Sequence, residues 1–427
     1  MKFPKDSEFI CIDHFDEAQY LEALNWVDDH RRVAIVTDCE RISTDPRVKI
    51  YQFETTLQID LIIKQIAWSA VQKKTAIFAE PEFKKKLHEC HLAANLILSE
   101  MADWGVNVLQ NARANHQPSR KGVELKGAFS NIPAIIVGAG PSLEKNKHLL
   151  KEFEDKALIF AGGTALNVID VEPHFAASID PAAPHEQFKS QPFMNAPFCY
   201  QGRMNHENFS LIQGEKIRFP DGSSDAINWI YGEETFNSGW TVGNFLTAIA
   251  MHMGCSPIIF VGMDLCYHNM KKYAQVEAQI PDNLVQIGDV WTQNDWLMAV
   301  RWTSEQSVGR KFINATEGGI LGLTEMPLER VLQTCVTKWD LRKKVIEEIQ
   351  KCPLECGEDR WAQWDQSIKR LKKGVEDLEA EVVYQKLLMP LWQVWRHIFE
   401  REVQLDPKQK IDLHRALFFQ QVLHAHG

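Results

Sequence analysis

The sequence predicts an α/β protein whose middle is an open parallel sheet, and three observations support that prediction. From about residue 30, short apolar runs alternate with longer amphipathic stretches, which is the pattern of βαβ units. Several of the apolar runs end in glycine, serine or aspartate, as strands do where their carboxyl ends face a ligand crevice. After about residue 326 the short apolar runs disappear and only helical spacing remains.

Length and charge limit the classes of function. The chain has 427 residues, enough for roughly two to four domains. Its 57 acidic residues exceed its 47 basic residues, and the net charge of −10 disfavours nucleic acid or an anionic membrane as the main partner. No apolar run approaches the roughly 18 residues of a membrane helix, and no signal-peptide core follows the first residues, so a cytoplasmic protein is expected.

The first domain of the prediction covers residues 1–118 and is a smaller α/β domain. Residues 32–37 and 75–79 are apolar runs that favour buried strands. Leucine and isoleucine recur at helical spacing between these runs and again after the second. The polar run 115–122 contains proline, serine and glycine, so we expect a linker there.

The central domain, residues 126–325, is expected to be a Rossmann-like parallel sheet. Its strands are predicted at residues 132–137, 157–161, 175–179 and 257–261. Small or polar residues follow these strands, among them Gly138, Gly163, Asp180 and Asp264. Because the carboxyl ends of parallel strands meet at one edge of the sheet, these residues are expected to line one crevice.

The last domain, residues 326–427, is expected to be all-helical. From Trp361 to Val382 apolar residues are spaced alternately three and four apart, which places them on one face of a long helix. Residues 327–350, 388–404 and 407–425 also favour helix. The apolar face either packs onto neighbouring helices or forms the seam of a homo-oligomer.

Inspection excludes several kinds of site. The nine cysteines are spread along the chain, and Cys352 and Cys356 have no second pair at zinc-site spacing. No P-loop, His-Glu-x-x-His or Gly-x-Ser-x-Gly motif is present. No two aspartates stand two residues apart, so neither a clamped metal nor a cofactor is expected. A leaving group would then be stabilised by Arg, Lys, helix N-termini or tyrosine hydroxyls.

The turn Gly138-Ala139-Gly140-Pro141-Ser142-Leu143 stands between a predicted strand and a predicted helix. Backbone N–H groups and the helix dipole can receive a phosphate at such a place. Leu143 stands where a dinucleotide-binding motif has its third glycine, and Pro141 suits the first helical position. The turn is therefore either a phosphate site or only a tight connection. Further along, Ser238 suits the N-cap of an apolar helix.

Other side chains near the strand ends could hold an anion or a sugar. The cations are Lys145, Lys147, Arg203, Lys271 and Lys272, each of which also suits a solvated surface. Trp291, Trp296 and Trp302 could stack on a sugar or a nucleobase, although buried packing is the commoner role of tryptophan. Gly318 and Gly319 are expected at the rim of a pocket.

Five motifs, in order, resemble the motility-associated factor (Maf) proteins. They are Gly138-Ala139-Gly140-Pro141-Ser142-Leu143-Glu144-Lys145-Asn146, Gly162-Gly163-Thr164-Ala165, Ser178-Ile179-Asp180-Pro181, Asn237-Ser238-Gly239 and Val261-Gly262-Met263-Asp264-Leu265. Maf proteins are flagellin glycosyltransferases implicated in attaching nonulosonic acids to Ser or Thr, and they share their central domain with 6-hydroxymethylpterin pyrophosphokinase. The resemblance covers about residues 126–325.

The same motifs look like those of bacterial sialyltransferases that use CMP-sialic acid. That likeness implies a nucleotide pocket lined by Gly138, Gly140, Pro141, Ser142, Gly163, Thr164, Asp180, Ser238, Gly239 and Asp264. It also implies that Tyr267 and Tyr273 contact the leaving phosphate, since a phenol can donate to it without a metal. The general-base histidine of those enzymes has no counterpart here, and His268 and His185 are the nearest substitutes.

Three functions remain open from the sequence. The resemblance implies a metal-independent transferase that passes an acidic sugar from CMP to a protein hydroxyl, with flagellin as a candidate acceptor. The alternative enzyme transfers pyrophosphate from ATP with Mg²⁺ to a pterin alcohol, but Ser178-Ile179-Asp180-Pro181 supplies only one carboxylate. The third is a nucleotide-binding assembly protein that acts through its helical tail without catalysis.

Overall fold

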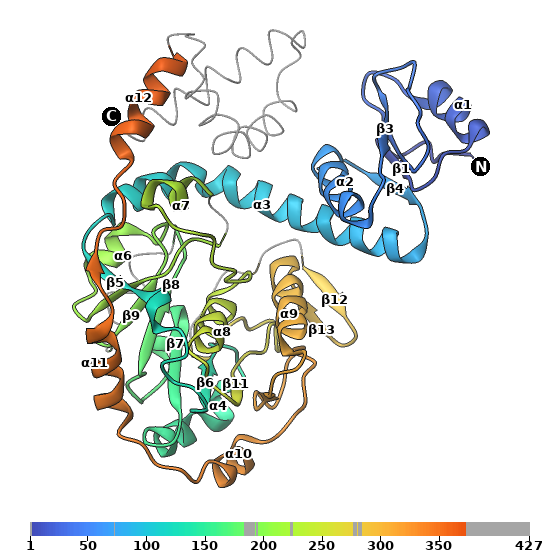
Figure 1. The fold of residues 1–427 in the computed structure, drawn as a ribbon. Coiled ribbons are helices and arrows are strands. Elements are labelled where there is room, and N and C mark those ends of the chain that lie inside the picture. The colour runs from blue at the N-terminus through green and yellow to red at the C-terminus, as the bar shows by residue number, and fades with distance from the viewer. Residues whose placement is uncertain are drawn as a thin grey trace. The chain divides into compact units, whose positions relative to one another are not determined.

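The computed structural model describes residues 2–71, 73–182, 193, 195–222, 225–275, 280 and 284–372. The described residues form two compact units, which part between Asp103 and Trp104 (Figure 1). Residues 104–118, expected in the first domain, belong to the second unit. The three-domain division itself stays a prediction.

The first unit contains a four-stranded parallel sheet in the order β3-β2-β1-β4. Its elements are β1 (Phe9–Ile12), α1 (Glu17–Trp26), β2 (Arg32–Thr37), β3 (Val48–Gln52), α2 (Thr56–Ser69), β4 (Thr75–Phe78) and the first part of α3 (Pro81–Ala114), which continues into the second unit from Trp104. Alternate residues of β1 face opposite sides, with Cys11 in the cluster under α2 and Ile10 in the cluster under α1. The predicted strands at 32–37 and 75–79 are confirmed as β2 and β4.

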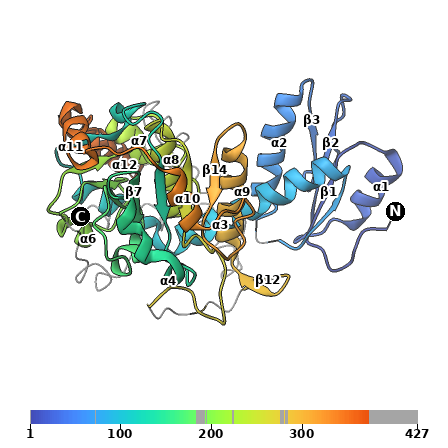
Figure 2. The same cartoon turned by 90° about the horizontal axis from the view of Figure 1, so that it is seen from below.

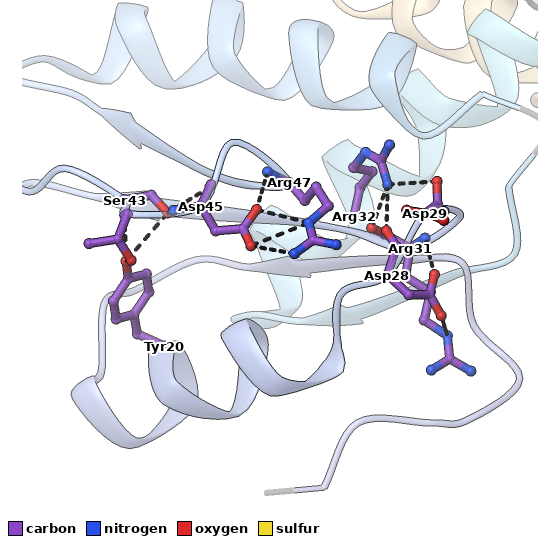
Figure 3. Close-up of polar contacts among 9 residues, drawn as sticks. Tyr20, Asp28, Asp29, Arg31, Arg32, Ser43, Asp45 and Arg47 are labelled. Atoms are coloured by element: carbon purple, nitrogen blue, oxygen red, sulfur yellow. Dashed lines mark hydrogen bonds and ion pairs between the residues drawn. The ribbon is translucent and has the colours of Figure 1, made fainter. Parts of the chain in front are cut away.

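A loop replaces the usual crossover helix between β2 and β3. The Tyr20 hydroxyl on α1 lies 3.1 Å from the hydroxyl of Thr44 and accepts the Thr44 N–H at 2.8 Å. Arg47 Nη2 donates to Asp45 Oδ2 at 2.6 Å (Figure 3). These Arg47 bonds lower the pKa of Asp45 to about 2. The loop is therefore fixed to α1 and to itself by side chains, and no helix is needed to hold it.

The second unit confirms the predicted Rossmann-like sheet. The strand order is β14-β11-β6-β7-β8-β9-β10-β5-β15, and every neighbouring pair is parallel except β15 with β5. The strands are β5 (Ser119–Lys121), β6 (Ala134–Val137), β7 (Leu158–Gly162), β8 (Phe175–Ser178), β9 (Phe198–Tyr200), β10 (Lys216–Arg218), β11 (Ile258–Val261), β14 (Phe312–Asn314) and β15 (Leu354–Glu355). An antiparallel hairpin, β12 (Val285–Ile287) with β13 (Val290–Thr292), lies outside this sheet.

Helices cover both faces of the sheet. The α-helices that begin in the second unit are α4 (Leu143–Asn146), α6 (His206–Ser210), α7 (Asp225–Tyr231), α8 (Val242–His252), α9 (Asn294–Ser307), α10 (Leu328–Thr334), α11 (Leu341–Lys351) and α12 (Trp361–Lys372). Helix α8 packs on β6 and β7, and Figure 2 shows it near β7. Ile136 shares a buried cluster with α8 and α11, whereas its neighbour Ile135 shares one with α10. The sheet is apolar on both faces, as expected of a buried parallel sheet.

The expected linker at 115–122 is wrong, because these residues belong to the central sheet. Ser119–Lys121 form β5, which pairs with β10 and β15. The Asn115 amide donates to the carbonyls of Gly202 and Met204, and the hydroxyls of Ser119 and Tyr200 lie 2.6 Å apart. The polar side chains that suggested a solvated linker instead bind the polar groups of neighbouring loops and strands.

The described start of the expected helical domain contains α10, α11 and α12, as predicted, and also the short strand β15. Leu341, Val345 and Ile349 of α11 belong to a core cluster of the central sheet. The predicted apolar face begins in α12, where Trp361 and Trp364 are buried. Its continuation beyond residue 372 and the helices expected at 388–404 and 407–425 lie outside the described residues.

No helix in the described ranges has both the length and the apolar character needed to cross a membrane.

Candidate active site

The order of the strands reverses between β6 and β11. The chain passes from β6 through β7, β8 and β9 to β10 on one side, and then crosses to β11 on the other side of β6. Val137 pairs with Val261, so Gly138 and Gly262 leave the sheet side by side. In open α/β sheets, ligands bind outside the carboxyl ends of the strands at such a reversal. The topology therefore places the candidate site above β6 and β11.

The two glycines of the turn after β6 permit a close approach by the loop after β11. A Cβ on Gly138 would lie 2.4 Å from the carbonyl oxygen of Gly262, and a Cβ on Gly140 would lie 1.9 Å from Asp264 Oδ2. Neither distance is compatible with a side chain. Both glycines are therefore required here because the loop that carries Asp264 occupies the space.

The turn after β6 is a tight connection, one of the two roles predicted for it. The N–H of Gly140 donates to the Gly262 carbonyl at 2.9 Å, that of Ser142 to Asp264 Oδ1 at 3.3 Å, and that of Leu143 to the Gly140 carbonyl at 3.0 Å. Helix α4 has a single turn and begins at Leu143, so Pro141 precedes the N-cap instead of opening the helix. These three N–H groups already bind protein oxygens, and a phosphate site in this turn stays a prediction.

Asp264 joins the two loops. Its Oδ2 accepts the Ser142 hydroxyl at 2.6 Å and its Oδ1 lies 2.7 Å from His268 Nε2. Burial raises the pKa of the Asp264 carboxyl, and the bonds from Ser142 and His268 oppose that shift. Because Nε2 of His268 donates to Asp264, Nδ1 is the ring nitrogen that can accept a proton. The His268 side chain is 35% exposed, so a substrate can reach the ring.

The segment after β14 lies against the same carboxyl group. A Cβ on Gly318 would stand 3.5 Å from Ser142 Cβ and 3.6 Å from His268 Nε2. Gly319, at φ +79°, approaches so closely that a Cβ would lie 2.3 Å from the Asp264 carbonyl oxygen. Gly318 and Gly319 therefore sit beside the Asp264 pair, where a pocket rim was expected.

Residues Leu265–Gln275, called here the return loop, lead from Asp264 back to the turn after β6. His268 and Lys271 bond each other's backbone in a tight hairpin, and the Ala274 N–H donates to the Ala139 carbonyl at 2.8 Å. Six described residues other than glycine have positive φ: Asn131, Leu265, Asn269, Met270, Gln275 and Glu317. All except Asn131 are in the return loop or next to Gly318. Such strain is typical of binding sites.

The two candidate tyrosines differ in their surroundings. The Tyr267 hydroxyl donates to Gln293 Oε1 at 2.8 Å, and its ring centroid lies 5.1 Å from that of Trp296. Burial raises the pKa of Tyr267 to about 12. Tyr273 is half-buried in the return loop, with Lys272 Nζ 5.2 Å from its ring centroid. Tyr273 is therefore the better placed of the two to meet a substrate.

Packing accounts for two of the three tryptophans considered. Trp296 and Trp302 are buried, and Trp302 Nε1 donates to Asn237 Oδ1 at 2.9 Å. Trp291 is 39% exposed on β13.

Ser238 lies at the same edge of the sheet but farther along it. Its hydroxyl accepts from Gln201 Nε2 at 3.2 Å, just beyond β9. Strand β9 is three strands from β6, a spacing of roughly 14 Å. The N-cap of α8 is Thr241, whose hydroxyl accepts the Asn244 N–H, so the expected capping role of Ser238 is wrong. The sequence Thr241-Val242-Gly243-Asn244 could have indicated the correct N-cap, since threonine is a favoured N-cap residue.

The first residues of α8 contact the residues that follow β7 and those that follow β11. Val242 Cγ2 would lie 2.7 Å from a Cβ on Gly162, at the end of β7, and Gly163 is next in the chain. Met263, after β11, lies against both Gly243 and Gly138. If either glycine had a Cβ, that atom would lie 2.8 Å from Met263 Sδ. The start of this eleven-residue helix therefore lies beside the strand ends, where a helix N-terminus favours an anion.

The remaining candidates have mostly local partners. Gly239 has φ +66° and packs on Asn244, and Thr164 is half-buried just after β7. Asp180 is exposed and its Oδ1 accepts the Ala182 N–H at 2.9 Å, which closes its own turn. His185 lies outside the described residues.

The candidate cations also differ in their partners. Lys145 donates to the Glu317 carbonyl at 2.6 Å, Lys147 pairs with Glu144 at 3.3 Å, and Arg203 lies 3.9 Å from Asp221.

Over the described parts of the chain, no group of three or more His, Cys, Asp or Glu side chains is arranged to hold a metal ion.

The topology and the polar groups at its reversal define a Rossmann-like α/β protein with a candidate ligand site at the carboxyl edge of its sheet. Residues 106–270 match the family described as 6-hydroxymethylpterin diphosphokinase MptE-like, so this part of the chain is similar to that family. A solved structure described as a MAf glycosyltransferase from Magnetospirillum magneticum AMB-1 is similar over 98% of this chain and 78% of its own. The TM-score is 0.60 and the sequence identity 16%.

No curated protein matches the chain. The family match and the solved structure together confirm the predicted resemblance to the Maf and MptE-like proteins, and the solved structure shares the fold.

Proposed function

We propose that the chain is a metal-independent glycosyltransferase that moves a nonulosonic acid from its CMP ester to a Ser or Thr hydroxyl of a protein, with flagellin as the candidate acceptor. The observation that carries this proposal is the Asp264–His268 pair at the strand reversal, with Nε2 and Oδ1 2.7 Å apart. The similarity to a solved structure described as a MAf glycosyltransferase supports it.

In the proposed reaction His268 is the general base. Its Nδ1 takes the proton of the acceptor hydroxyl as the oxygen bonds to the anomeric carbon from one face. The bond from that carbon to the phosphate oxygen breaks on the other face, and its electron pair leaves with CMP, so the configuration inverts. Asp264 holds the ring through Nε2 and stabilises the imidazolium that forms, as an aspartate does in a hydrolase triad.

The departing phosphate needs donors in place of a metal. The proposal assigns this role to the Tyr273 hydroxyl and to the N-terminus of α8, which lies beside the same strand ends. The nucleotide would lie along the edge from the turn after β6 towards Ser238.

A pyrophosphokinase-like activity is the second candidate, and the family match favours it. Transfer from ATP normally uses Mg²⁺ bound by carboxylates. Of the two aspartates that the sequence predicted at the strand ends, Asp180 closes its own turn and Asp264 holds Ser142 and His268. Their present contacts therefore favour the transferase.

The test compares His268→Gln with the wild-type protein in a CMP-release assay with CMP-nonulosonic acid and an acceptor protein. Glutamine can still donate an N–H to Asp264 but cannot act as a base. We expect a loss of about 100- to 10,000-fold in rate with CMP affinity unchanged. His148→Gln, at an exposed position, is the matched control and keeps full activity. Retained activity in His268→Gln, or transfer that needs ATP and Mg²⁺, would contradict the proposal.

A further inference from the structure

Lys272 is a cation in the return loop whose surroundings are aromatic. Its Nζ lies 5.2 Å from the ring centroid of Tyr273 and 5.5 Å from that of Trp296. The side chain is half-buried, whereas its neighbour Lys271 is exposed. Two residues later the Ala274 N–H donates to the Ala139 carbonyl, which joins this part of the return loop to the turn after β6.

No carboxylate neutralises this ammonium group within the described residues. The carboxyl groups on the segments that border the return loop have other partners: Asp264 binds Ser142 and His268, Glu144 pairs with Lys147, and Asp295 accepts from Gln293. The rings of Tyr273 and Trp296 attract the cation but carry no net charge. Among the described residues, the contacts of the Lys272 ammonium group are thus aromatic, in a chain whose net charge is −10.

The surroundings of Lys272 suit its ammonium group to binding an oxyanion. Partial burial weakens the hydration of an ammonium group, so an oxyanion that reaches it gains more than at an open surface. The aromatic contacts restrict the flexible lysine stem, so less entropy is lost when a ligand binds. The Tyr273 hydroxyl, on the next residue, is a second donor for the same anion.

We propose that Lys272 binds the oxyanion of the donor substrate, phosphate or carboxylate, and so sets the specificity of the site for an acidic donor. This inference rests on the proposed function and adds to it the side chain that recognises the charge. Lys272 is the anion-binding residue of the return loop, and Lys271 is not.

The test is calorimetric titration of the full-length protein with two pairs of probes. CMP and cytidine differ in the phosphate, and a free nonulosonic acid and its methyl ester differ in the carboxylate. We expect Lys272→Ala to weaken binding of the anionic member of one pair by about tenfold or more, with the neutral member unchanged. The affected pair identifies the oxyanion. Lys271→Ala, the matched control, changes neither pair, and Lys272→Arg retains part of the affinity.

The outcomes separate this inference from the proposed function. If the wild-type protein binds CMP and Lys272→Ala binds it equally well, with the acid pair also unchanged, the inference is wrong and the transferase proposal stands. If Lys272→Ala loses the charged and neutral probes alike, the residue acts on folding and the inference is also wrong. If the wild-type protein binds none of the four probes, both proposals fall.

A second measurement applies to the wild-type protein alone. Bound CMP or nonulosonic acid should protect Lys272, but not Lys271, from acetylation, as read by peptide mass spectrometry. Equal labelling of both lysines in the presence of bound ligand would overturn the inference.

Discussion

Gly140 lacks a side chain because the Asp264 carboxylate occupies the place that its Cβ would take. The sequence predicted a glycine-containing turn at this position and an aspartate at the end of a later strand. It could not predict their contact, because Ser142 and Asp264 are 122 positions apart. The hydrogen bond between them depends on β11 returning beside β6, which is a property of the whole sheet.

Gly140→Ala should displace Asp264. The added methyl group would stand 1.9 Å from Oδ2, so the loop after β11 must move. We expect a loss of stability of about 1–3 kcal/mol, seen in urea unfolding, together with loss of transferase activity.

The control for this change is Gly318→Ala, which adds the same methyl group beside the same carboxyl. The nearest atom there is Ser142 Cβ at 3.5 Å, an ordinary contact. Equal effects of the two substitutions would show that close packing at Gly140 is not the cause.

Asp264→Asn should gain stability relative to the wild-type protein as pH rises. Burial raises the folded-state pKa of Asp264, so the wild-type protein loses stability as pH rises through that value. Asparagine does not titrate, and the difference should reach about 1 kcal/mol per unit of raised pKa. Urea unfolding at about pH 4, near the pKa of an unfolded aspartate, and at about pH 8 measures it. A constant difference at both pH values would mean that burial does not destabilise the ionised carboxyl.

At the scale of elements, short strands were the hardest to predict. The strands at 132–137, 157–161, 175–179 and 257–261 were found because they are long apolar runs followed by small residues. Strands β9 and β10 have three residues each, too few for a periodic pattern, and are defined by their neighbours in the sheet. The start of α8 was misplaced because Ser238 and Thr241 are both good N-cap residues, and the hydroxyl of Ser238 faces Gln201 instead.

Thr241→Ala should weaken α8, since it removes the acceptor of the Asn244 N–H. The expected cost is about 1 kcal/mol in thermal or urea unfolding, and Thr241→Ser should restore most of it. Ser238→Ala is the comparison, because the Gln201 amide keeps its bond to the Pro220 carbonyl. A larger loss in Ser238→Ala than in Thr241→Ala would assign the cap to Ser238.

At the scale of the whole molecule, the sequence predicted a smaller α/β domain, a central parallel sheet and a helical continuation, because strand and helix periodicities are local properties. It did not predict that Leu341, Val345 and Ile349 pack on the central sheet, or that Ser119–Lys121 join it. Those contacts are formed between segments far apart in the sequence and depend on how the whole sheet is assembled. Expected linkers and domain ends are consequently the least secure parts of such predictions.

Global stability should fall as pH drops below about 6.5, and His174 is one cause. The residue is fully buried, and its Nδ1 accepts the Ile159 N–H at 3.0 Å. Burial, helped by the charge of Arg342, lowers its pKa to about 3. Below about pH 6.5 the His174 ring therefore becomes protonated in the unfolded chain but stays neutral in the folded chain. The free energy of unfolding consequently decreases as pH falls.

His174→Asn tests this contribution, because asparagine can accept the Ile159 N–H without titrating. Between about pH 6.5 and pH 4 the wild-type protein should lose up to about 1.4 kcal/mol per pH unit more than the variant. Parallel curves for the two proteins would exclude His174 as a source of acid sensitivity.

The most direct test of the CMP-sugar site is one calorimetric comparison, titration with CMP in the presence of EDTA and with ATP in the presence of Mg²⁺. A transferase of the proposed kind binds CMP with the chelator present and does not require ATP or the metal. Binding of ATP with Mg²⁺, and none of CMP, would contradict it and favour pyrophosphoryl transfer.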